Sequence, residues 1–217
     1  IPQYIIEKWN RKGFQPKQIQ FMEGDSIKIL FAGDFVPPQL SSSVYSENLQ
    51  AILKEKDFSI VNLEAPFTVR GKAIKKTGKH FKINPELIDV VKEGFFDAVA
   101  LANNHIRDYG NEGVRDTLHI CHKNCIDTIG AGVNLSEAKK SLRIKVKDKR
   151  IAFLNYCERE FNIATNDNAG ANAYDTISAY YDIQKEKQKN DYIFVIYHGG
   201  LEYQYYPTIE MVTKFRF

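Results

Sequence analysis

The stretch FDAVALANNHIRDYG, residues 96–110, joins a short apolar run to a group of polar side chains. Its first seven residues, 96–102, are typical of a buried strand, because all but Asp97 are hydrophobic. Asn103, Asn104 and His105 follow directly. A buried strand that ends in polar side chains raises the question of whether other strands of the chain end in the same way.

Apolar runs alternate with amphipathic segments along the rest of the chain. Further runs typical of strands covered on both faces are residues 27–33, 58–63, 150–156 and 192–197. The segments between them that predict helices are residues 44–56, 84–94, 111–124 and 176–190. This order predicts an α/β fold in which helices pack on a sheet.

The composition is that of an ordinary globular protein. The chain has 217 residues, of which 43% are hydrophobic and 26% charged, and this suits one large domain. A net charge of +3 is too small to indicate nucleic-acid binding. No apolar run reaches the roughly 20 residues that span a bilayer. Three cysteines without a framework spacing, and no signal peptide, favour a cytoplasmic location. A membrane-associated or extracellular location stays open, because the chain does not start with methionine.

Polar side chains follow several of the predicted strands. These strand ends supply Asp34, Glu64, Asn104 and His198. In α/β sheets the carboxyl ends of the strands line a shared crevice, so we expect the four side chains to converge. Carboxylate, amide and imidazole donors together suit a divalent cation such as Mn, Zn or Fe. Each residue alone is also ordinary turn or cap chemistry, so the prediction depends on all of them lying together.

The order of the motifs resembles the CapA/PgsA poly-γ-glutamate capsule biosynthesis family, which is similar in fold to the calcineurin-like metallophosphoesterases. The matching stretches are FAGDF (31–35), VNLEAPFT (61–68), KHFKINPE (79–86), ALANNHIRDYG (100–110), GAGVNLSEA (130–138) and HGGLEY (198–203). The resemblance implies a four-layer αββα sandwich over residues 26–217, after an irregular extension at 1–25. We expect this domain to be incomplete, because TIEMVTKFRF (208–217) predicts a helix and the family's closing histidine motif does not follow.

The resemblance also implies roles for individual residues. The strand-end residues Asp34, Glu64, Asn104 and His198 would hold a divalent metal, with one ion or two in the full-length protein. His105 would be catalytic, as a proton donor or oxyanion stabiliser. The residues predicted to contact substrate are Asn103, Lys79, Lys82 and Glu202. The expected ligand is an anionic substrate or polymer, the candidate partners are other capsule-synthesis subunits, and nucleic acid is not expected.

Three further features have a functional and a plainer interpretation. HICHKNC (119–125) superficially resembles a zinc cluster, but residues two apart on a helix do not share a face, so we expect buried cysteines and surface histidines. The lysine-rich loop at 69–80 either steers an anionic substrate or is a solvated loop. The tyrosines at 203–206 either wall a pocket or pack against a helix. Glu158 and Glu160 receive no role.

Two classes of function fit these observations. The first is a metal-dependent hydrolase or related enzyme that acts on a phosphate ester or a γ-glutamyl-type polymer. The second is a non-catalytic component of capsule polymer synthesis or export that keeps the fold and part of the site. A likeness of fold does not decide between them.

Overall fold

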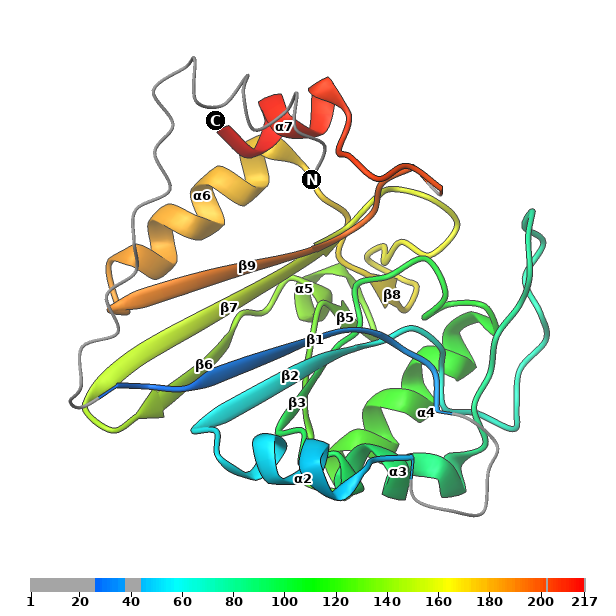
Figure 1. Ribbon diagram of the computed structural model, residues 1–217. Helices are drawn as coiled ribbons and strands as arrows, with labels where there is room; N and C mark the ends of the chain where they lie inside the picture. Colours follow the sequence, from blue (N-terminus) through cyan, green and yellow to red (C-terminus); the bar gives the residue numbers. More distant parts are fainter. Residues whose placement is uncertain (1–25, 38–43, 202, 217) are drawn as a thin grey trace.

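Two β-sheets lie face to face at the centre of the molecule, and helices cover the outer face of each sheet (Figure 1). The computed structural model describes residues 26–37, 44–201 and 203–216. The first sheet has the strand order β1-β2-β3-β4, and all of its neighbouring strands are parallel. These strands are β1 Ile29–Phe35, β2 Phe58–Leu63, β3 Ala98–Ala100 and β4 Asp127–Ile129.

The second sheet has the strand order β6-β7-β9. Strand β6 (Leu142–Val146) pairs antiparallel with β7 (Lys149–Cys157), and β7 pairs parallel with β9 (Tyr192–His198). A separate antiparallel pair joins β5 (Ala131–Gly132) to β8 (Gly170–Ala171). Strands β7 and β9 therefore deliver their carboxyl ends to the same edge of the second sheet.

The helices form the two outer layers. Three helices supply side chains to the apolar cluster on the outer face of the first sheet: α2 (Glu47–Lys54), α3 (Ile88–Glu93) and α4 (Gly110–Lys123). The short 3-10 helix η1 (Pro85–Leu87) directly precedes α3. Helix α6 (Thr176–Lys187) packs on the outer face of the second sheet. The short helices α5 (Leu135–Ala138) and α7 (Ile209–Arg216) complete the described elements. The helix–sheet–sheet–helix order confirms the predicted four-layer sandwich (Figure 1).

Aromatic side chains fill the layer between the two sheets. Phe153 of β7 is fully buried, and its ring lies 5.3 Å from that of Phe58 and 5.5 Å from that of Phe194. Phe31 of β1 lies 6.1 Å from the same ring. Rings from both sheets thus meet on one side chain, and burial of this apolar surface drives the sheets together.

The alternation of side chains along each strand extends this layer to the carboxyl ends. In β2, Phe58 and Ile60 face the inter-sheet layer, so Asn62 faces the same side. In β9, Phe194 and Ile196 face the layer, and His198 follows two residues later. The apolar layer therefore ends in polar side chains from both sheets.

A β-bulge redirects the end of β1. Ala32 pairs with Val61 and Asp34 pairs with Asn62, so Gly33 is an extra residue in β1. Regular alternation would turn Asp34 toward the same side as Ala32, which packs with the outer helix layer. The bulge reverses this alternation and turns the carboxylate of Asp34 toward the second sheet.

The elements outside the long periodic segments were not predicted. These elements are β4, β5, β6, β8 and α5, of which only β6 exceeds four residues. The expected helix at 208–217 is present as α7 (Ile209–Arg216). Cys121 is buried as predicted, but the prediction for Cys125 is wrong, because this residue follows the end of α4 with φ of 57° and is exposed. The extension predicted at 1–25 lies outside the described residues.

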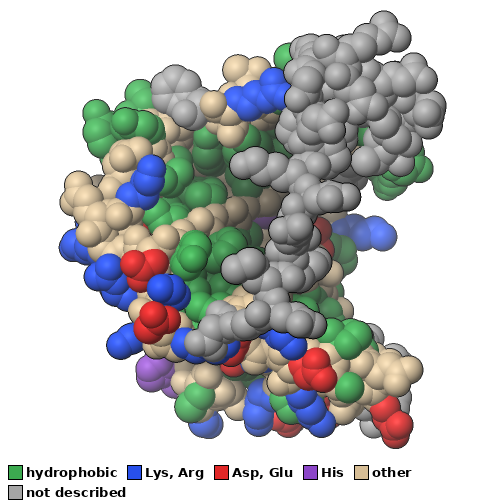
Figure 2. Space-filling model, turned by 60° about the vertical axis from the view of Figure 1, so that its left-hand side comes forward, with side chains coloured by type: hydrophobic (Ala, Val, Ile, Leu, Met, Phe, Trp, Pro, Cys, Tyr) green, Lys and Arg blue, Asp and Glu red, His purple; other side chains and the backbone are tan. Residues whose placement is uncertain are grey.

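One face of the molecule exposes hydrophobic side chains with charged groups around them (Figure 2). In the edge strands of the two sheets, as far as the chain is described, Phe31 of β1 is 46% exposed and Val195 of β9 is 43% exposed. Within the described ranges, no helix has the length and hydropathy needed to cross a bilayer.

Replacing Phe153 by alanine is expected to lower the free energy of unfolding by about 3–5 kcal/mol, because it leaves a cavity between the sheets. Phe153→Leu should cost only about 1.5 kcal/mol or less, because leucine fills part of the space. Urea titration followed by circular dichroism measures both. Phe161→Ala is the matched control; this ring is 46% exposed, and its loss should change stability by about 0.5 kcal/mol at most. Equal losses at both positions would contradict the central place given to Phe153.

Candidate metal centre

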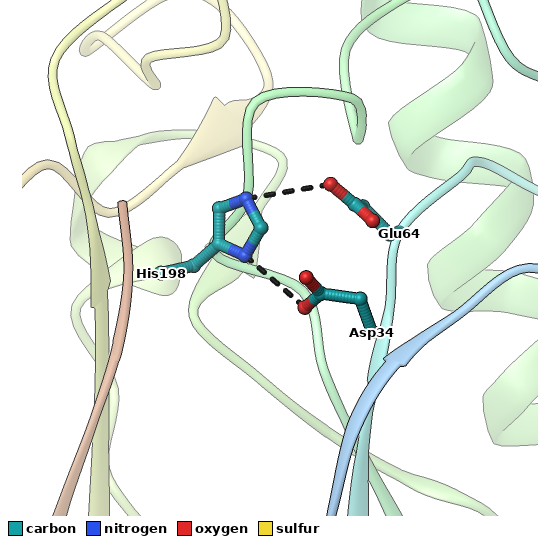
Figure 3. A group of neighbouring side chains, drawn as sticks. All are labelled: Asp34, Glu64 and His198. Atoms are coloured by element: carbon teal, nitrogen blue, oxygen red, sulfur yellow. Dashed lines mark ion pairs between the residues drawn. The ribbon is translucent and has the colours of Figure 1, made fainter. Parts of the chain in front are cut away.

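Three ionisable side chains meet where the strands of both sheets end (Figure 3). Asp34 lies in β1, Glu64 follows β2 directly, and His198 ends β9. One potential ligand atom from each lies within 4.8 Å of the others. His198 Nδ1 is 3.4 Å from Asp34 Oδ1, and His198 Nε2 is 3.5 Å from Glu64 Oε1. The imidazole therefore lies between two carboxylates that come from the opposite sheet.

Asn104 joins this group from the segment after β3. Its Oδ1 lies 3.1 Å from His198 Nε2. The structure thus brings together the four strand-end residues named by the sequence, although their binding of a metal stays a prediction. The donor set of two carboxylates, an imidazole and an amide oxygen is of the type that binds a divalent transition metal, so the residues present fit such an ion.

The four side chains line one side of a cavity of about 510 Å³. Glu158 and Glu160, from the segment after β7, line it as well. The other described lining residues include Cys157, Tyr197, Gly199, Gly200, Leu201, Gln204, Tyr205, Tyr206, Pro207 and Met211. The lining has four carboxylates and, among the described residues, no lysine or arginine, so its charge favours cations.

Close packing at the end of β9 requires glycine. A Cβ atom at Gly199 would lie 2.5 Å from Cγ of Glu158 and 2.8 Å from the hydroxyl oxygen of Tyr197. Burial and the neighbouring Glu158 carboxylate, which accepts a hydrogen bond from the hydroxyl, raise the pKa of Tyr197. Glu158 is therefore fixed against β9 at the cavity wall.

The cavity presents no thiolate. Cys157 is 1% exposed, and burial raises the pKa of its thiol to about 12. Its sulfur accepts a hydrogen bond from Asn162 Nδ2 at 3.1 Å. A protonated and buried thiol leaves oxygen and nitrogen donors as the available ligands.

His105 belongs to a separate buried ion-pair group. Its Nδ1 lies 2.7 Å from Asp108 Oδ2, and the ammonium of Lys76 pairs with the other oxygen of Asp108. The backbone N–H of Phe81 also donates to Asp108, at 2.7 Å. Burial raises the pKa of Asp108, but the hydrogen bonds from His105, Lys76 and Phe81 outweigh it, so the pKa lies below the ordinary carboxyl value. Asp108 is therefore ionised at neutral pH, and its contact with Nδ1 orients the imidazole of His105, whose Nδ1 also lies 3.2 Å from the ammonium of Lys76.

Several predicted residues occupy places other than the predicted ones. His105 is 12% exposed at its side chain and is not among the cavity-lining residues. Asn103 is fully buried, and its side chain bonds to the backbone of Leu63 and Ile106, while its contact with substrate stays a prediction. Lys79 and Lys82 are exposed and do not line the cavity, and the ammonium of Lys82 lies 5.0 Å over the ring of Tyr109. Glu202 lies outside the described residues.

Sequence reasoning missed other members of the site. One of them is Asn62, which the alternation of β2 places on the inter-sheet face two residues before Glu64. Glu158 and Glu160 follow β7, whose parallel pairing with β9 brings its end to the same edge. Asp108 lies three residues after His105, a spacing that predicts contact where the backbone turns.

These features define an α/β protein of two packed sheets with a carboxylate–imidazole centre at the carboxyl ends of its strands. The family model described as "Bacterial capsule synthesis protein PGA_cap" matches residues 20–216. The chain therefore belongs to this family of bacterial capsule synthesis proteins.

Relatives with assigned names agree with this membership. The chain is 30% identical over 212 residues to the PGA biosynthesis protein CapA of Bacillus subtilis (strain 168), covering 92% of this chain and 55% of the relative. It is 25% identical over 221 residues to the capsule biosynthesis protein CapA of Bacillus anthracis, covering 94% and 54%. The chain thus spans about half the length of these relatives. A hypothetical protein from Thermus thermophilus superposes with a TM-score of 0.41 at 17% identity, over 70% of this chain and 50% of that one.

Asp108→Asn is expected to lower the free energy of unfolding at neutral pH by about 3 kcal/mol, because it leaves Lys76 buried without its counter-ion. A carboxyl whose folded pKa is lowered contributes stability above its unfolded pKa, and this contribution is lost as pH falls through the folded pKa. The wild type should therefore lose stability more steeply than the variant below about pH 4.

Urea titrations at several pH values measure this difference. Asp148→Asn is the control, because this carboxylate is 81% exposed at its side chain and should change little. A parallel pH dependence in wild type and Asp108→Asn would contradict the assignment.

Proposed function

We propose that this chain forms the divalent-metal centre of a metal-dependent hydrolase or related enzyme in bacterial capsule synthesis. The observation that carries the proposal is the convergence of ligand atoms of Asp34, Glu64 and His198 within 4.8 Å, at the carboxyl ends of three strands from two sheets. Such convergence from distant segments gives a donor set that ordinary turn and cap chemistry does not explain. The proposed substrate is a phosphate ester or a poly-γ-glutamate-type polymer.

The charge of the cavity supports a cation in this enzyme. Its wall carries carboxylates from Asp34, Glu64, Glu158 and Glu160, which would repel an anionic substrate. A bound divalent cation would offset this charge, polarise a substrate oxygen and lower the pKa of a coordinated water. In the proposal, Asp34, Glu64, Asn104 and His198 hold the ion.

The other described groups act on substrate or on protons. Since Asp108 and Lys76 both contact Nδ1 of His105, the opposite nitrogen of this imidazole is left to exchange a proton with substrate or water. Tyr205 and Tyr206 line the cavity and supply aromatic surface for binding. The exposed lysines of the loop at 69–80 would attract an anionic chain toward the molecule.

A second candidate is a non-catalytic component of capsule polymer synthesis. The observation that favours it is that His105 does not line the cavity, so the described wall holds no second imidazole beside His198. Relatives from Mycobacterium tuberculosis, 30% identical over 94 residues, are named probable polyglutamine synthesis accessory proteins. A chain that binds metal but hydrolyses neither phosphodiesters nor γ-glutamyl polymer would favour this candidate.

Asp34→Asn and His198→Gln are expected to weaken binding of Mn²⁺ by more than the roughly 10–100-fold that loss of an outer-shell partner costs. His105→Gln should leave Mn²⁺ binding nearly unchanged but slow hydrolysis by about 100-fold or more. Isothermal titration calorimetry measures the first effect, and hydrolysis of a generic phosphodiester measures the second.

His122→Gln is the matched control, since this imidazole is exposed on α4. Equal loss of Mn²⁺ binding in the Asp34, His198 and His105 variants would refute the division of roles. Undetectable Mn²⁺ and Zn²⁺ binding by the wild type would refute the metal centre itself.

A further inference from the structure

A chain of hydrogen bonds runs from the backbone after β3 to His198, and the backbone fixes its direction. Asn103 Oδ1 lies 3.1 Å from the backbone nitrogen of His105 and 2.9 Å from that of Ile106. Because a backbone N–H only donates, this end of the Asn103 side chain is the oxygen. Its Nδ2 accordingly donates to the carbonyl oxygen of Leu63, at 2.8 Å. Two independent backbone contacts therefore agree on the orientation of this amide.

The orientation of Asn103 determines that of Asn62. Asn103 Nδ2 lies 3.2 Å from Asn62, which must present its oxygen to this donor. The other end of Asn62 is then Nδ2, which lies 2.6 Å from Asp34 Oδ1 and 3.1 Å from His198 Nδ1. An ionised carboxylate only accepts hydrogen bonds, so the contact with Asp34 supports the same assignment. Asn62 thus donates both of its N–H groups into the centre.

The donor at Asn62 determines the tautomer of His198. Nδ1 of a neutral imidazole that receives an N–H has no proton, so the proton is on Nε2. Nε2 faces only acceptors among the contacts described: Asn104 Oδ1 at 3.1 Å and Glu64 Oε1 at 3.5 Å. The shorter contact at Nδ1, with the Asn62 donor, and both contacts at Nε2 favour this tautomer, whereas the carboxylate oxygen of Asp34, 3.4 Å from Nδ1, is the contact that opposes it.

We propose that Asn62, oriented by Asn103, is a positioning residue that holds His198 in the Nε2–H tautomer beside Asp34. The lone pair on Nδ1 then faces Asp34, and Asn104 accepts the Nε2 proton. Metal-binding imidazoles usually donate their second N–H to such an acceptor, so the arrangement assigns Nδ1 as the ligand atom. It also changes the role of Asn104 in the proposed centre, because its Oδ1 then orients the ring through Nε2 and does not hold the ion. This last assignment rests on the proposed metal centre, whereas the tautomer does not.

Position 62 requires a side chain that donates hydrogen bonds to Asp34 and His198, and asparagine does so whereas an ionised aspartate does not. Asn62 is 8% exposed, and a carboxylate there would lie against the carboxylate of Asp34 and could only accept. Asn62→Asp should therefore reverse the tautomer, since Nδ1 would then have to donate. Asn62→Ala should remove the preference and leave a mixture of both tautomers.

Long-range ¹H–¹⁵N correlation spectra of the metal-free chain, at a pH where imidazole is neutral, test the proposal. The chain holds five histidines, so His198→Gln identifies the signals of His198. The wild type should show a proton on Nε2, and Asn62→Asp should show it on Nδ1. Asn124→Asp is the matched control, because Asn124 donates to the carbonyl oxygen of Ile120 at the end of α4. This variant should keep the wild-type signals of His198.

A proton on Nδ1 in the wild type would overturn the proposal without the need for any variant. A folded Asn62→Asp chain with the wild-type tautomer would overturn it too. Asn103→Ala adds a test at a second position, where partial loss of the preference is expected. Because no metal is added, these results are independent of metal binding. If the protein shows Nε2–H on His198 but binds no Mn²⁺, the positioning role of Asn62 stands and the proposed metal centre is refuted.

Discussion

The apolar layer between the two sheets holds the rest of the structure in place. Rings of Phe58 in the first sheet and Phe194 in the second meet on Phe153, so the sheets have little freedom to slide past each other. All strands of the first sheet are parallel, and β9 runs parallel to β7, so the carboxyl ends of these strands gather at one edge of each sheet. Asn62 and His198 extend the inward faces beyond the last apolar residues. The geometry of the candidate centre therefore follows from the packing of the core.

Polar groups at the end of an apolar layer need partners, and buried amides supply them. Asn155 on the inner face of β7 accepts a hydrogen bond from the backbone N–H of Ala102 at 2.8 Å, which joins the second sheet to the end of β3. Asn162 donates to the carbonyl oxygen of Asn103 at 2.7 Å. Buried amides whose groups are all paired rigidify a site at little net cost. Because amides are neutral, these side chains add no charge of their own next to the carboxylates of the site.

Sequence patterns predicted the parts of the fold that depend on periodicity. Long apolar runs predicted the central strands, and the polar residues that follow these runs predicted the strand-end residues of the candidate site. Short elements such as β5 and β8 depend on tertiary pairing and have no period of their own. The bulge at Gly33 could not be predicted from the sequence either, because it is defined by the register between β1 and β2. Residues that act through others, such as Asn62, emerge only when the hydrogen-bond partners are known.

The distribution of charge matters more here than the net charge. Lys76 of the loop at 69–80 is 5% exposed at its side chain and neutralises Asp108, so this lysine stabilises the fold and is not available to an incoming anion. The neighbouring lysines at 72, 75 and 79 are exposed, whereas the described cavity wall carries carboxylates and no basic side chain. The net charge of +3 is thus the sum of a basic surface loop, an acidic cavity and the other charged groups, and it does not indicate how these charges are distributed. In the proposed enzyme the loop would attract the anionic substrate over about a Debye length, roughly 8–10 Å, and a bound cation would offset the negative charge of the cavity wall.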